Sequence, residues 1–534
     1  MGVPHQRVMH WWQTGILYQV YPRSFQDTNG DGVGDLAGVT QRLPYLAELG
    51  VDAVWLSPVF VSPMADFGYD IADHTAIDPL FGTMADFDAL LARAHALGLK
   101  VILDLVPNHT SDRHPWFKES RVSRQSAKRD WYIWRNGAPE GGPPNNWLSE
   151  FGGSAWQHDA ATDQYYYHAF LREQPDLNWR NPHVREAMHG VMRFWLGRGV
   201  DGFRVDVMWH LIKDAAFRDN PPNPDWREGE AGYGRLLPVY STDRPEVHEV
   251  VRELRAVIDE YADRVLIGET YLPIEKLVAY YGENLSGAHM PFNFSLIETP
   301  WEAGAITALV ERYEAALPHG AWPNWVFGNH DRRRLASRIG EAQARVAAML
   351  LLTLRGTPTL YYGDELGLPQ VAIPLAQERD PWGRNVPGHG RDGCRTAMPW
   401  DVGSFSGFST VEPWLPLNPD AGIRNVAVQS TDSGSILSLY RRLIALRRAT
   451  PALSGGSYRP LAQSGTGFAY ERAGSGAVLV VALNFGAASL EISLKSMPYG
   501  SRVVLGTKPG REGEAVGDRL ILHPDEGVII SCVS

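Results

Sequence analysis

The sequence of 534 residues predicts an α/β fold: a (β/α)8 TIM barrel with an inserted subdomain after the third strand and a C-terminal antiparallel β domain. Short apolar runs alternate with helical segments, which is typical of a parallel sheet. The alternation breaks after the third run in a stretch rich in Trp, Tyr, Gly and Pro, and it gives way at the end to alternating Val, Leu, Ser and Thr. We expect the barrel in residues 1–110 and 182–453, the inserted subdomain in 111–181 and a C-terminal β-sandwich domain in 454–534.

Eight apolar runs have the length of buried strands. They are Ile16–Tyr21, Asp52–Leu56, Lys100–Val106, Val200–Val207, Arg264–Thr270, His289–Phe294, Asn324–Phe327 and Thr357–Tyr362. Helical periodicity between and after them predicts helices at Leu36–Leu49, Ala85–Leu97, Pro182–Arg198, Pro245–Ala262 and Ile436–Leu446. In such folds the functional groups gather at the carboxyl ends of the strands.

Composition excludes several classes of protein. A formal net charge of -11 and a pI near 5.9 leave no basic surface for a nucleic acid. Cys394 and Cys532 form no metal-ligand pattern, so we expect free thiols. The N-terminal stretch MGVPHQRVMHWW has no apolar segment of the signal-peptide kind, and nowhere do 18 apolar residues run together. We therefore predict a cytoplasmic protein without a membrane span.

The loop after the first strand, DTNGDGVGD, is rich in oxygen donors. Side chains at alternating positions, with one main-chain carbonyl filling a gap, can surround a hard divalent cation. The candidate ligands are Asp27, Asn29, Asp31, the Val33 carbonyl and Asp35. The loop departs from an EF-hand, because its twelfth position is Gly38 instead of Glu. A solvated Asx-turn loop without metal is the alternative.

Charged residues end three of the predicted strands. In VDGFRVDV, Arg204 and Asp206 are two residues apart and so lie on the same face of a strand. A buried structural ion pair would explain this pair alone. However, Glu269 ends the fifth strand, and Asp331 follows the seventh. Such carboxyl groups meet at one end of a barrel, and glycoside hydrolysis requires such a set: one attacks the sugar or activates water, and one protonates the leaving oxygen.

The chain resembles the α-amylase superfamily, glycoside hydrolase family 13. The ordered segments DLVPNH, GFRVD, GET and FGNHD are similar to the signature regions of that family. The segments QVYPRSFQDTNGDGVGDL and QPDLNW resemble its α-glucosidase and oligo-1,6-glucosidase branch. The resemblance covers nearly the whole chain and includes the predicted barrel, inserted subdomain and C-terminal domain.

This resemblance implies a role for each candidate residue. Asp206 would be the nucleophile, Glu269 the general acid/base and Asp331 the transition-state stabiliser. Arg204 would hold Asp206 ionised, since a nearby cation lowers the pKa of a carboxyl group. Arg395, in GCRTAMPW, would close the site from the loop after the last strand. The expected substrate-binding residues are Asp66, Tyr69, His109, Phe151, Gln174, Arg204, Val207, His330 and Arg395. The family also implies one structural divalent cation in the loop, Ca²⁺ in preference to Mg²⁺, and no organic cofactor.

The activity implied is that of a retaining, exo-acting α-glucosidase, which releases α-glucose from the non-reducing end of short oligosaccharides such as maltose or isomaltose. In this branch a valine after the nucleophile is usual in enzymes that favour α-1,6 bonds, and Val207 fits; an ordinary β-branched strand residue is the alternative.

A transglucosidase is a second hypothesis. A non-catalytic relative, like the accessory subunits of amino-acid transporters, is a remote third. We expect a monomer or homodimer.

Three segments depart from the branch pattern. Phe327 and Gly328 replace a Trp-Asn pair, and Arg332–Arg334 replace a Gln-Pro-Arg segment beside the acceptor side. RTPMQW is here RTAMPW, with Ala397 and Pro399, so the loop that carries Arg395 is expected to differ in shape.

Overall fold

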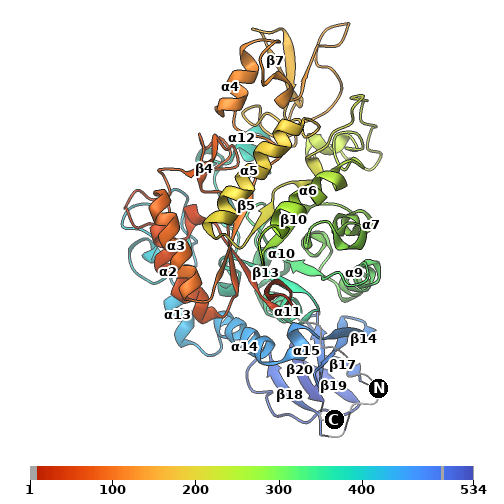
Figure 1. Ribbon diagram of the computed structural model, residues 1–534. Helices are drawn as coiled ribbons and strands as arrows, with labels where there is room; N and C mark the ends of the chain where they lie inside the picture. Colours follow the sequence, from red (N-terminus) through yellow and green to blue (C-terminus); the bar gives the residue numbers. More distant parts are fainter. Residues whose placement is uncertain (1–8, 495–497, 499, 533–534) are drawn as a thin grey trace.

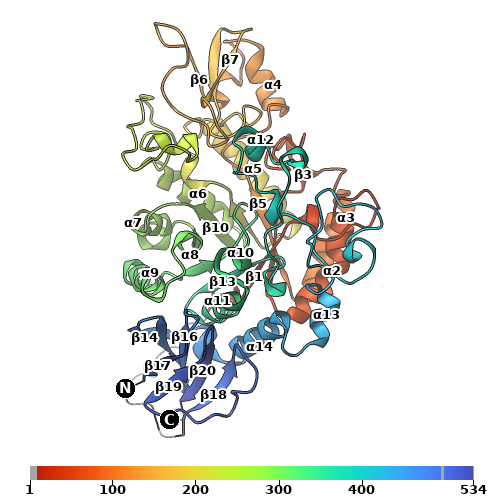
Figure 2. The same ribbon diagram turned by 180° about the vertical axis from the view of Figure 1, so that it is seen from behind.

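The computed structural model of the protein describes residues 9–494, 498 and 500–532. The first eight residues, which belong to the N-terminal stretch without a signal-peptide pattern, lie outside this range. A barrel occupies the middle of the molecule, and the inserted and C-terminal segments lie at its opposite ends (Figure 1 and, from behind, Figure 2). The predicted fold class is confirmed.

Eight parallel strands form the barrel sheet in the order β11-β10-β9-β5-β2-β1-β13-β12. Their bounds are β1 Leu17–Val20, β2 Ala53–Leu56, β5 Lys100–Leu105, β9 Gly202–Val205, β10 Val265–Thr270, β11 Met290–Asn293, β12 Asn324–Val326 and β13 Thr357–Tyr361. Every one falls within a run that the sequence predicts. The sequence missed a short antiparallel hairpin after β2, formed by β3 (Phe60–Val61) and β4 (Asp73–Ile77).

Five helices around the sheet lie where the sequence predicts them: α2 Leu36–Leu49, α3 Met84–Ala96, α5 Pro182–Arg198, α6 Val247–Asp259 and α14 Ile436–Ala449. Two further helices, α9 Ala303–Ala316 and α11 Glu341–Thr353, were not predicted. Local signals set their ends. The Asn181 side chain caps α5, which begins on Pro182, and Gly199 ends it in a left-handed conformation with φ 109°.

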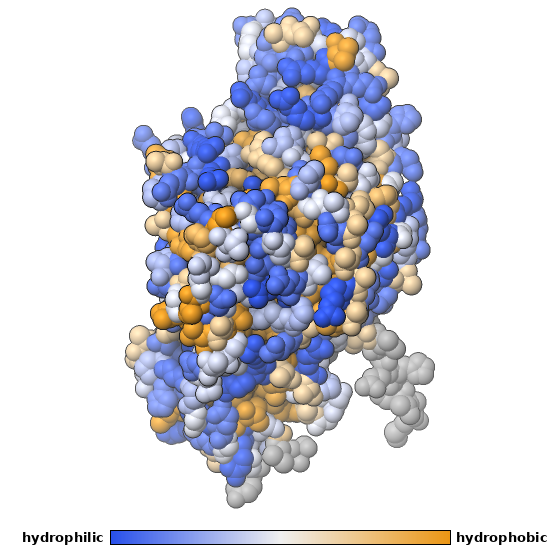
Figure 3. Space-filling view, turned by 90° about the vertical axis from the view of Figure 1, so that its left-hand side faces the viewer, coloured by the Kyte–Doolittle hydropathy of each residue, from blue (hydrophilic) through white to orange (hydrophobic). Residues whose placement is uncertain are grey.

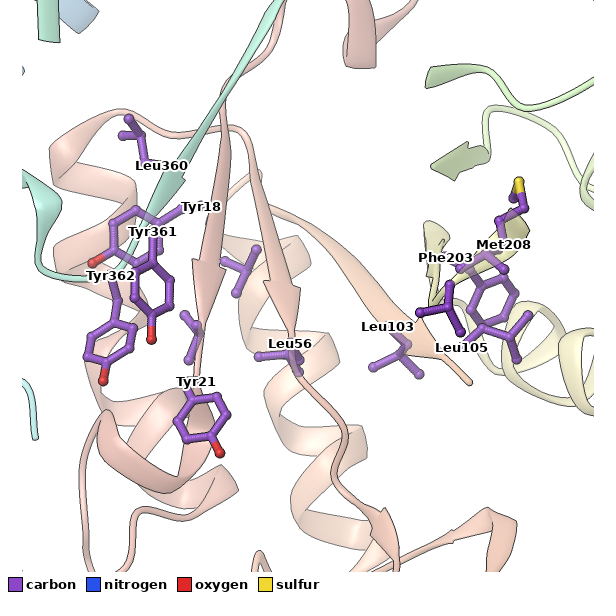
Figure 4. Close-up of a cluster of buried hydrophobic side chains, with 14 of the residues drawn as sticks. Tyr18, Tyr21, Leu56, Leu103, Leu105, Phe203, Met208, Leu360, Tyr361 and Tyr362 are labelled. Carbon is purple, nitrogen blue, oxygen red and sulfur yellow. The ribbon is translucent and has the colours of Figure 1, made fainter. Parts of the chain in front are cut away.

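The strands bury side chains on both faces, which explains their continuous apolar sequences. Leu17, Trp55 and Ile102 belong to a cluster inside the barrel. The alternate residues of the same strands face outward to the helices and belong to a second, larger cluster. Figure 4 shows members of this outer cluster: Tyr18, Leu56, Leu103, Leu105, Phe203 and Leu360.

One side chain bridges the seam between β11 and β12. The buried Asn324 accepts the N–H of Asn293 through Oδ1 at 2.9 Å and donates from Nδ2 to the carbonyl of Pro291. The amide side chain therefore supplies a donor and an acceptor to the neighbouring strand, as a main-chain peptide unit would.

The inserted segment after β5 has one helix and a small sheet. It contains α4 (Pro115–Val122), and its antiparallel strands, in the order β6-β8-β7, are Trp134–Arg135, Gln164–Tyr167 and Trp156–Asp159. Aromatic side chains supply much of its packing, as when Phe117 stacks on Trp134. The aromatic-rich composition is therefore in part structural.

The C-terminal segment consists of antiparallel strands around a core of its own. One sheet has the order β14-β15-β16-β20-β18, with β14 Ser457–Ser464, β15 Gly467–Gly474, β16 Ala477–Asn484, β20 Gly527–Cys532 and β18 Arg502–Gly506; the other pairs β17 Leu490–Ser493 with β19 Arg519–Leu522. The buried Arg472 of β15 donates to the carbonyl of Thr353, at the end of α11. This bond fixes the C-terminal sheet to the barrel.

In the ranges that the structure describes, no helix is both long and apolar enough to cross a membrane. Apolar and hydrophilic side chains are interspersed on the face that Figure 3 shows. Cys394 and Cys532 carry free thiols, as predicted.

The seam predicts a stability effect. Asn324→Ala leaves the N–H of Asn293 and the carbonyl of Pro291 without their partner, so we expect a loss of about 2–5 kcal/mol in the free energy of unfolding. Denaturant unfolding would measure it, with the exposed Asn385→Ala as the matched control. Equal stability of the two variants would contradict the role of Asn324.

Candidate active site

A cavity of about 240 Å³ opens at the carboxyl ends of the barrel strands. The sequence-predicted residues that line it are Asp66, Tyr69, His109, Phe151, Gln174, Asp206, Val207, Glu269, His330 and Asp331. Two others, Arg204 and Arg395, lie just behind these and contact them. The barrel thus brings together residues that six different strands and their following loops supply.

One buried guanidinium group joins the two carboxyl groups predicted to react. Arg204 Nη1 lies 2.8 Å from Asp206 Oδ1, and Nη2 lies 2.5 Å from Glu269 Oε2. Arg204 Nη1 also contacts Asp104 Oδ1 at 2.7 Å. The predicted proximity of Arg204 and Asp206 is therefore correct, although Asp206 lies just beyond the last residue of β9.

Our expectation for the protonation of Asp206 needs correction. Burial raises the pKa of Asp206 well above its usual range, and Arg204 only opposes this effect. Burial likewise raises the pKa of Glu269, again against Arg204. The two acids titrate as an interacting pair, so they retain a proton at a pH at which exposed carboxyl groups are ionised. One protonated and one ionised carboxyl group is the state that acid catalysis requires.

Val207 has an unusual backbone conformation. Its φ of 37° is in the left-handed region, which β-branched residues rarely adopt. In this conformation its N–H donates to Glu269 Oε2 at 2.8 Å, and its side chain lines the cavity. Val207 is therefore not an ordinary strand residue, and the strain is located at the site, where it fixes the Glu269 carboxyl group.

Asp331 lies beside an imidazole and two guanidinium groups in the cavity. Its oxygens are 3.3 Å from His330 Nε2, 3.0 Å from Arg391 Nη1 and 2.9 Å from Arg395 Nη2. Burial opposes ionisation, but the guanidinium groups of Arg391 and Arg395 outweigh it and hold the pKa of Asp331 well below its usual range. Asp331 is thus ionised near neutral pH, and its charge acts on Asp206 and Glu269.

Arg391 is the main residue that the sequence reasoning missed. It lines the cavity, and its Nη2 contacts both Asp66 Oδ1 and Asp380 Oδ1 at 2.7 Å, while Nη1 reaches Asp331. We assigned the role of closing the site to Arg395, which is 1% exposed, donates to the carbonyl of His330 and supports Asp331 from behind. Both arginines are in the segment RDGCRTAMPW, so its first arginine was the available signal.

The remaining polar residues are held by buried hydrogen bonds. Gln174 Nε2 lies 3.3 Å from Asp66 Oδ2 and 3.2 Å from His109 Nε2. Tyr69 stacks on His330 with the ring centroids 5.1 Å apart. Burial lowers the pKa of His109 to about 4, and it lowers that of His330 well below the usual range. Both imidazoles are neutral near pH 7, which suits hydrogen bonding to uncharged hydroxyl groups.

Aromatic residues form most of the rest of the wall, which also includes Glu150 and Pro238, and of these aromatic residues only Phe151 was predicted. The others are Phe170, Trp209, Tyr233, Tyr271 and Trp382. Arg332 lies over the Tyr271 ring, with Cζ 4.6 Å from its centroid. Of the three consecutive arginines, only Arg332 lines the cavity; Arg333 is exposed and Arg334 is buried.

The predicted metal loop has oxygen donors of the type that Ca²⁺ prefers, but they are bonded within the protein. Asp27 accepts the N–H groups of Asn29, Gly30 and Gly32 and the hydroxyl of Ser409. Asp35 caps α2 through Gly38 N–H. Among the described residues, no three His, Cys, Asp or Glu side chains are grouped to hold a metal ion. The cation remains a prediction, and it would have to replace some of these hydrogen bonds.

Comparisons with known proteins agree with this geometry. Residues 19–456 match the family model described as alpha amylase, catalytic domain. A probable alpha-glucosidase of Rhizobium meliloti is 47% identical over 467 residues, which are 84% of each chain. An oligo-1,6-glucosidase of Halalkalibacterium halodurans is 38% identical over 89% of this chain and 90% of its own. The crystal structure of the alpha-glucosyl transfer enzyme XgtA, 40% identical, superposes with a TM-score of 0.93 over 98% of this chain and 100% of its own.

The contacts of Arg391 predict a sensitive position. A lysine has a single ammonium group and cannot replace the fork that reaches Asp66, Asp331 and Asp380. We therefore expect Arg391→Lys to lower kcat/KM for an α-glucoside about 10- to 100-fold. Arg384→Lys, seven residues earlier in helix α12 (Pro381–Asn385), is the exposed control. A kcat/KM for Arg391→Lys equal to that of the control would show that Arg391 is dispensable.

Proposed function

Because the chain belongs to the α-amylase family of glycoside hydrolases, we propose that it is a retaining, exo-acting α-glucosidase that releases α-glucose from short α-glucosides. The single observation that carries this proposal is the buried group in which Arg204 contacts both Asp206 and Glu269. Two carboxyl groups that contact the same guanidinium must lie close together. This favours the short separation of the two carboxyl groups in retaining enzymes, about 5–5.5 Å, over the wider spacing in inverting enzymes.

In the first step Asp206 attacks the anomeric carbon of the terminal glucose. The bond from Asp206 Oδ to this carbon forms while the glycosidic bond breaks, and Glu269 gives its proton to the departing oxygen. Asp331, held ionised by its arginines, faces the positive charge that develops on the sugar ring. The product of this step is a covalent glucosyl-enzyme with an ionised Glu269.

In the second step water replaces the departed sugar. Glu269 takes a proton from the water as its oxygen attacks the anomeric carbon, and the bond to Asp206 breaks. Two inversions at the same carbon return the α configuration. Glu269 ends the cycle protonated and Asp206 ionised.

The polar end of the cavity supports the choice of a terminal glucose. Asp66 and His109 meet there with Arg391, and Gln174 links the first two. These groups offer donors and acceptors to the hydroxyl groups of one sugar ring, and the Asp66–Arg391 contact closes that side of the cavity. Short substrates such as maltose and isomaltose fit this arrangement.

The second candidate is a transglucosidase, in which a sugar or alcohol takes the place of water. The aromatic wall of Trp209, Tyr233 and Tyr271, together with Arg332, supports it by offering surface to an acceptor. XgtA, which this chain resembles over nearly its full length, is described as a glucosyl transfer enzyme. A non-catalytic function is disfavoured, because Asp206, Glu269 and Asp331 are all present at the cavity.

One experiment tests the function and chooses between the candidates. Wild-type enzyme incubated with maltose, isomaltose, kojibiose, nigerose and sucrose in labelled water should release α-glucose that carries the label. The anomer is read by NMR, and unlabelled transfer products at high substrate concentration would favour the transglucosidase.

Asp206→Asn should lower turnover more than about a thousandfold with folding intact. The exposed Asp225→Asn is its control. Wild-type turnover by Asp206→Asn would exclude the mechanism.

We further propose that one divalent cation, Ca²⁺ in preference to Mg²⁺, binds the loop of Asp27, Asn29, Asp31, Val33 and Asp35 and stabilises it. Two observations support a structural role: the loop is rich in oxygen donors, and it is far in sequence from the catalytic acids. No catalytic step depends on it. A cytoplasmic location and a monomeric or homodimeric state also remain predictions.

The cation proposal predicts a thermal effect. Millimolar Ca²⁺ should raise Tm by about 2–5 °C over enzyme treated with a chelator, since a ligand that binds only the folded state stabilises it. Asp31→Asn should abolish this shift, and Mg²⁺ should give a smaller one. Chelation that abolished turnover at an unchanged Tm would contradict the structural role.

A further inference from the structure

A fourth carboxyl group, that of Asp104, lies beneath the site. Asp104 is on β5, and only 1% of it is exposed. Its Oδ1 contacts Arg204 Nη1 at 2.7 Å, and its Oδ2 accepts the indole N–H of Trp55 at 3.1 Å and the hydroxyl of Tyr69 at 3.0 Å. It is separate from the described residues that line the cavity, so a bound sugar has no access to it.

Asp104 shares a single nitrogen with the proposed nucleophile. Arg204 Nη1 donates to Asp104 Oδ1 and to Asp206 Oδ1, whereas Nη2 contacts Glu269. All four side chains are buried, so water screens their charges poorly. One positive charge therefore faces three carboxyl groups. A negative charge on Asp104 offsets part of the electrostatic effect that Arg204 has on Asp206 and Glu269.

We propose that Asp104 is a positioning residue that acts through Arg204: it neutralises part of the guanidinium charge and thereby keeps the proton on Glu269. The inference rests on the proposed role of Glu269 as general acid/base. Asp104 also anchors Nη1 from below, so that the guanidinium plane is directed at both reacting acids.

The charged neighbours of each group support this reasoning. Glu269 faces Arg204, Asp206 and Asp331, with Tyr271 nearby and the Val207 N–H on Oε2. Of these groups, only Arg204 is a cation in contact with Glu269. Without an anion at position 104, the uncompensated Arg204 would favour the ionised forms of both Glu269 and Asp206, and a carboxyl group shifts toward lower pKa as the positive charge beside it increases.

The same charge balance serves the second step. When Asp206 is esterified to glucose it no longer carries a charge, so of the three carboxyl groups that contact Arg204 only those of Asp104 and Glu269 can still ionise; burial raises the pKa of Asp104 to about 6. Asp104 then limits the stabilisation of ionised Glu269, which leaves Glu269 basic enough to accept a proton from water.

The test is the pH dependence of kcat/KM with maltose in wild-type enzyme and in Asp104→Asn. The pair of Glu269 and Asp206 is active when it holds one proton, so activity lies between the lower and the upper apparent pKa of the pair. If Asp104→Asn lowers both, the whole bell-shaped profile should move toward lower pH, by about 1 pH unit on its alkaline side. Asp104→Glu, which keeps the charge, should restore the alkaline limb even where kcat is reduced.

Glu365→Gln is the matched control. Glu365 is a fully buried carboxyl group that accepts hydrogen bonds from the hydroxyls of Tyr18 and Tyr45, away from Arg204. Its profile should keep the wild-type limbs. Should Asp104→Asn fail to fold, Asp104→Ser leaves room for water beside Arg204 and has the same expected shift.

The outcomes separate the inference from the proposed function. A variant at position 104 that lost activity equally at every pH, with unmoved limbs, would show that Asp104 is only structural and overturn the inference. A wild-type enzyme without turnover of any α-glucoside would overturn the proposed function and the inference together. A shift toward lower pH in Asp104→Asn that Asp104→Glu reverses supports the inference.

Discussion

The contacts of the Arg204 guanidinium are the constraint on which the site depends. Arg204 lies on the inner face of β9 and holds Asp104 of β5, Asp206 beyond β9 and Glu269 of β10. Taking this cation out of water is costly, and only several carboxyl groups with good geometry repay the cost. The barrel provides them because neighbouring parallel strands bring alternate residues to the same inner face. The arrangement fixes the reacting acids before any substrate arrives.

The two halves of the cavity differ in charge and in polarity. On one side Arg391 and Arg395 keep Asp331 ionised, and on the other side buried Asp206 and Glu269 retain a proton. Chemically similar carboxyl groups within one small cavity therefore have pKa values shifted in opposite directions. The difference comes from their surroundings. The left-handed backbone at Val207 adds a fixed donor to Glu269. Backbone strain, buried charge and aromatic wall thus meet at one end of a rigid barrel.

Much of this could be predicted from the sequence, and the exceptions have a physical reason. The eight strands were predictable because strands buried on both faces are continuous apolar runs, and Arg204 and Asp206 because strand periodicity is local. Arg391, Tyr233 and Trp382 were missed, since their positions depend on loops that fold against distant parts of the chain. The sign of the Asp206 pKa shift was missed as well, because the sequence reveals a charged neighbour but not the depth of burial.

The contact between Asp66 and Arg391 joins residues 325 positions apart. During synthesis from the N-terminus, the strands that carry Asp206 and Glu269 emerge from the ribosome before the segment with Arg391. Contacts of such high sequence separation form late, because the loop between them must first be ordered. A nascent chain therefore has its reactive acids long before it has a closed pocket, and the capacity to hold a sugar arrives only when about three quarters of the protein has been made.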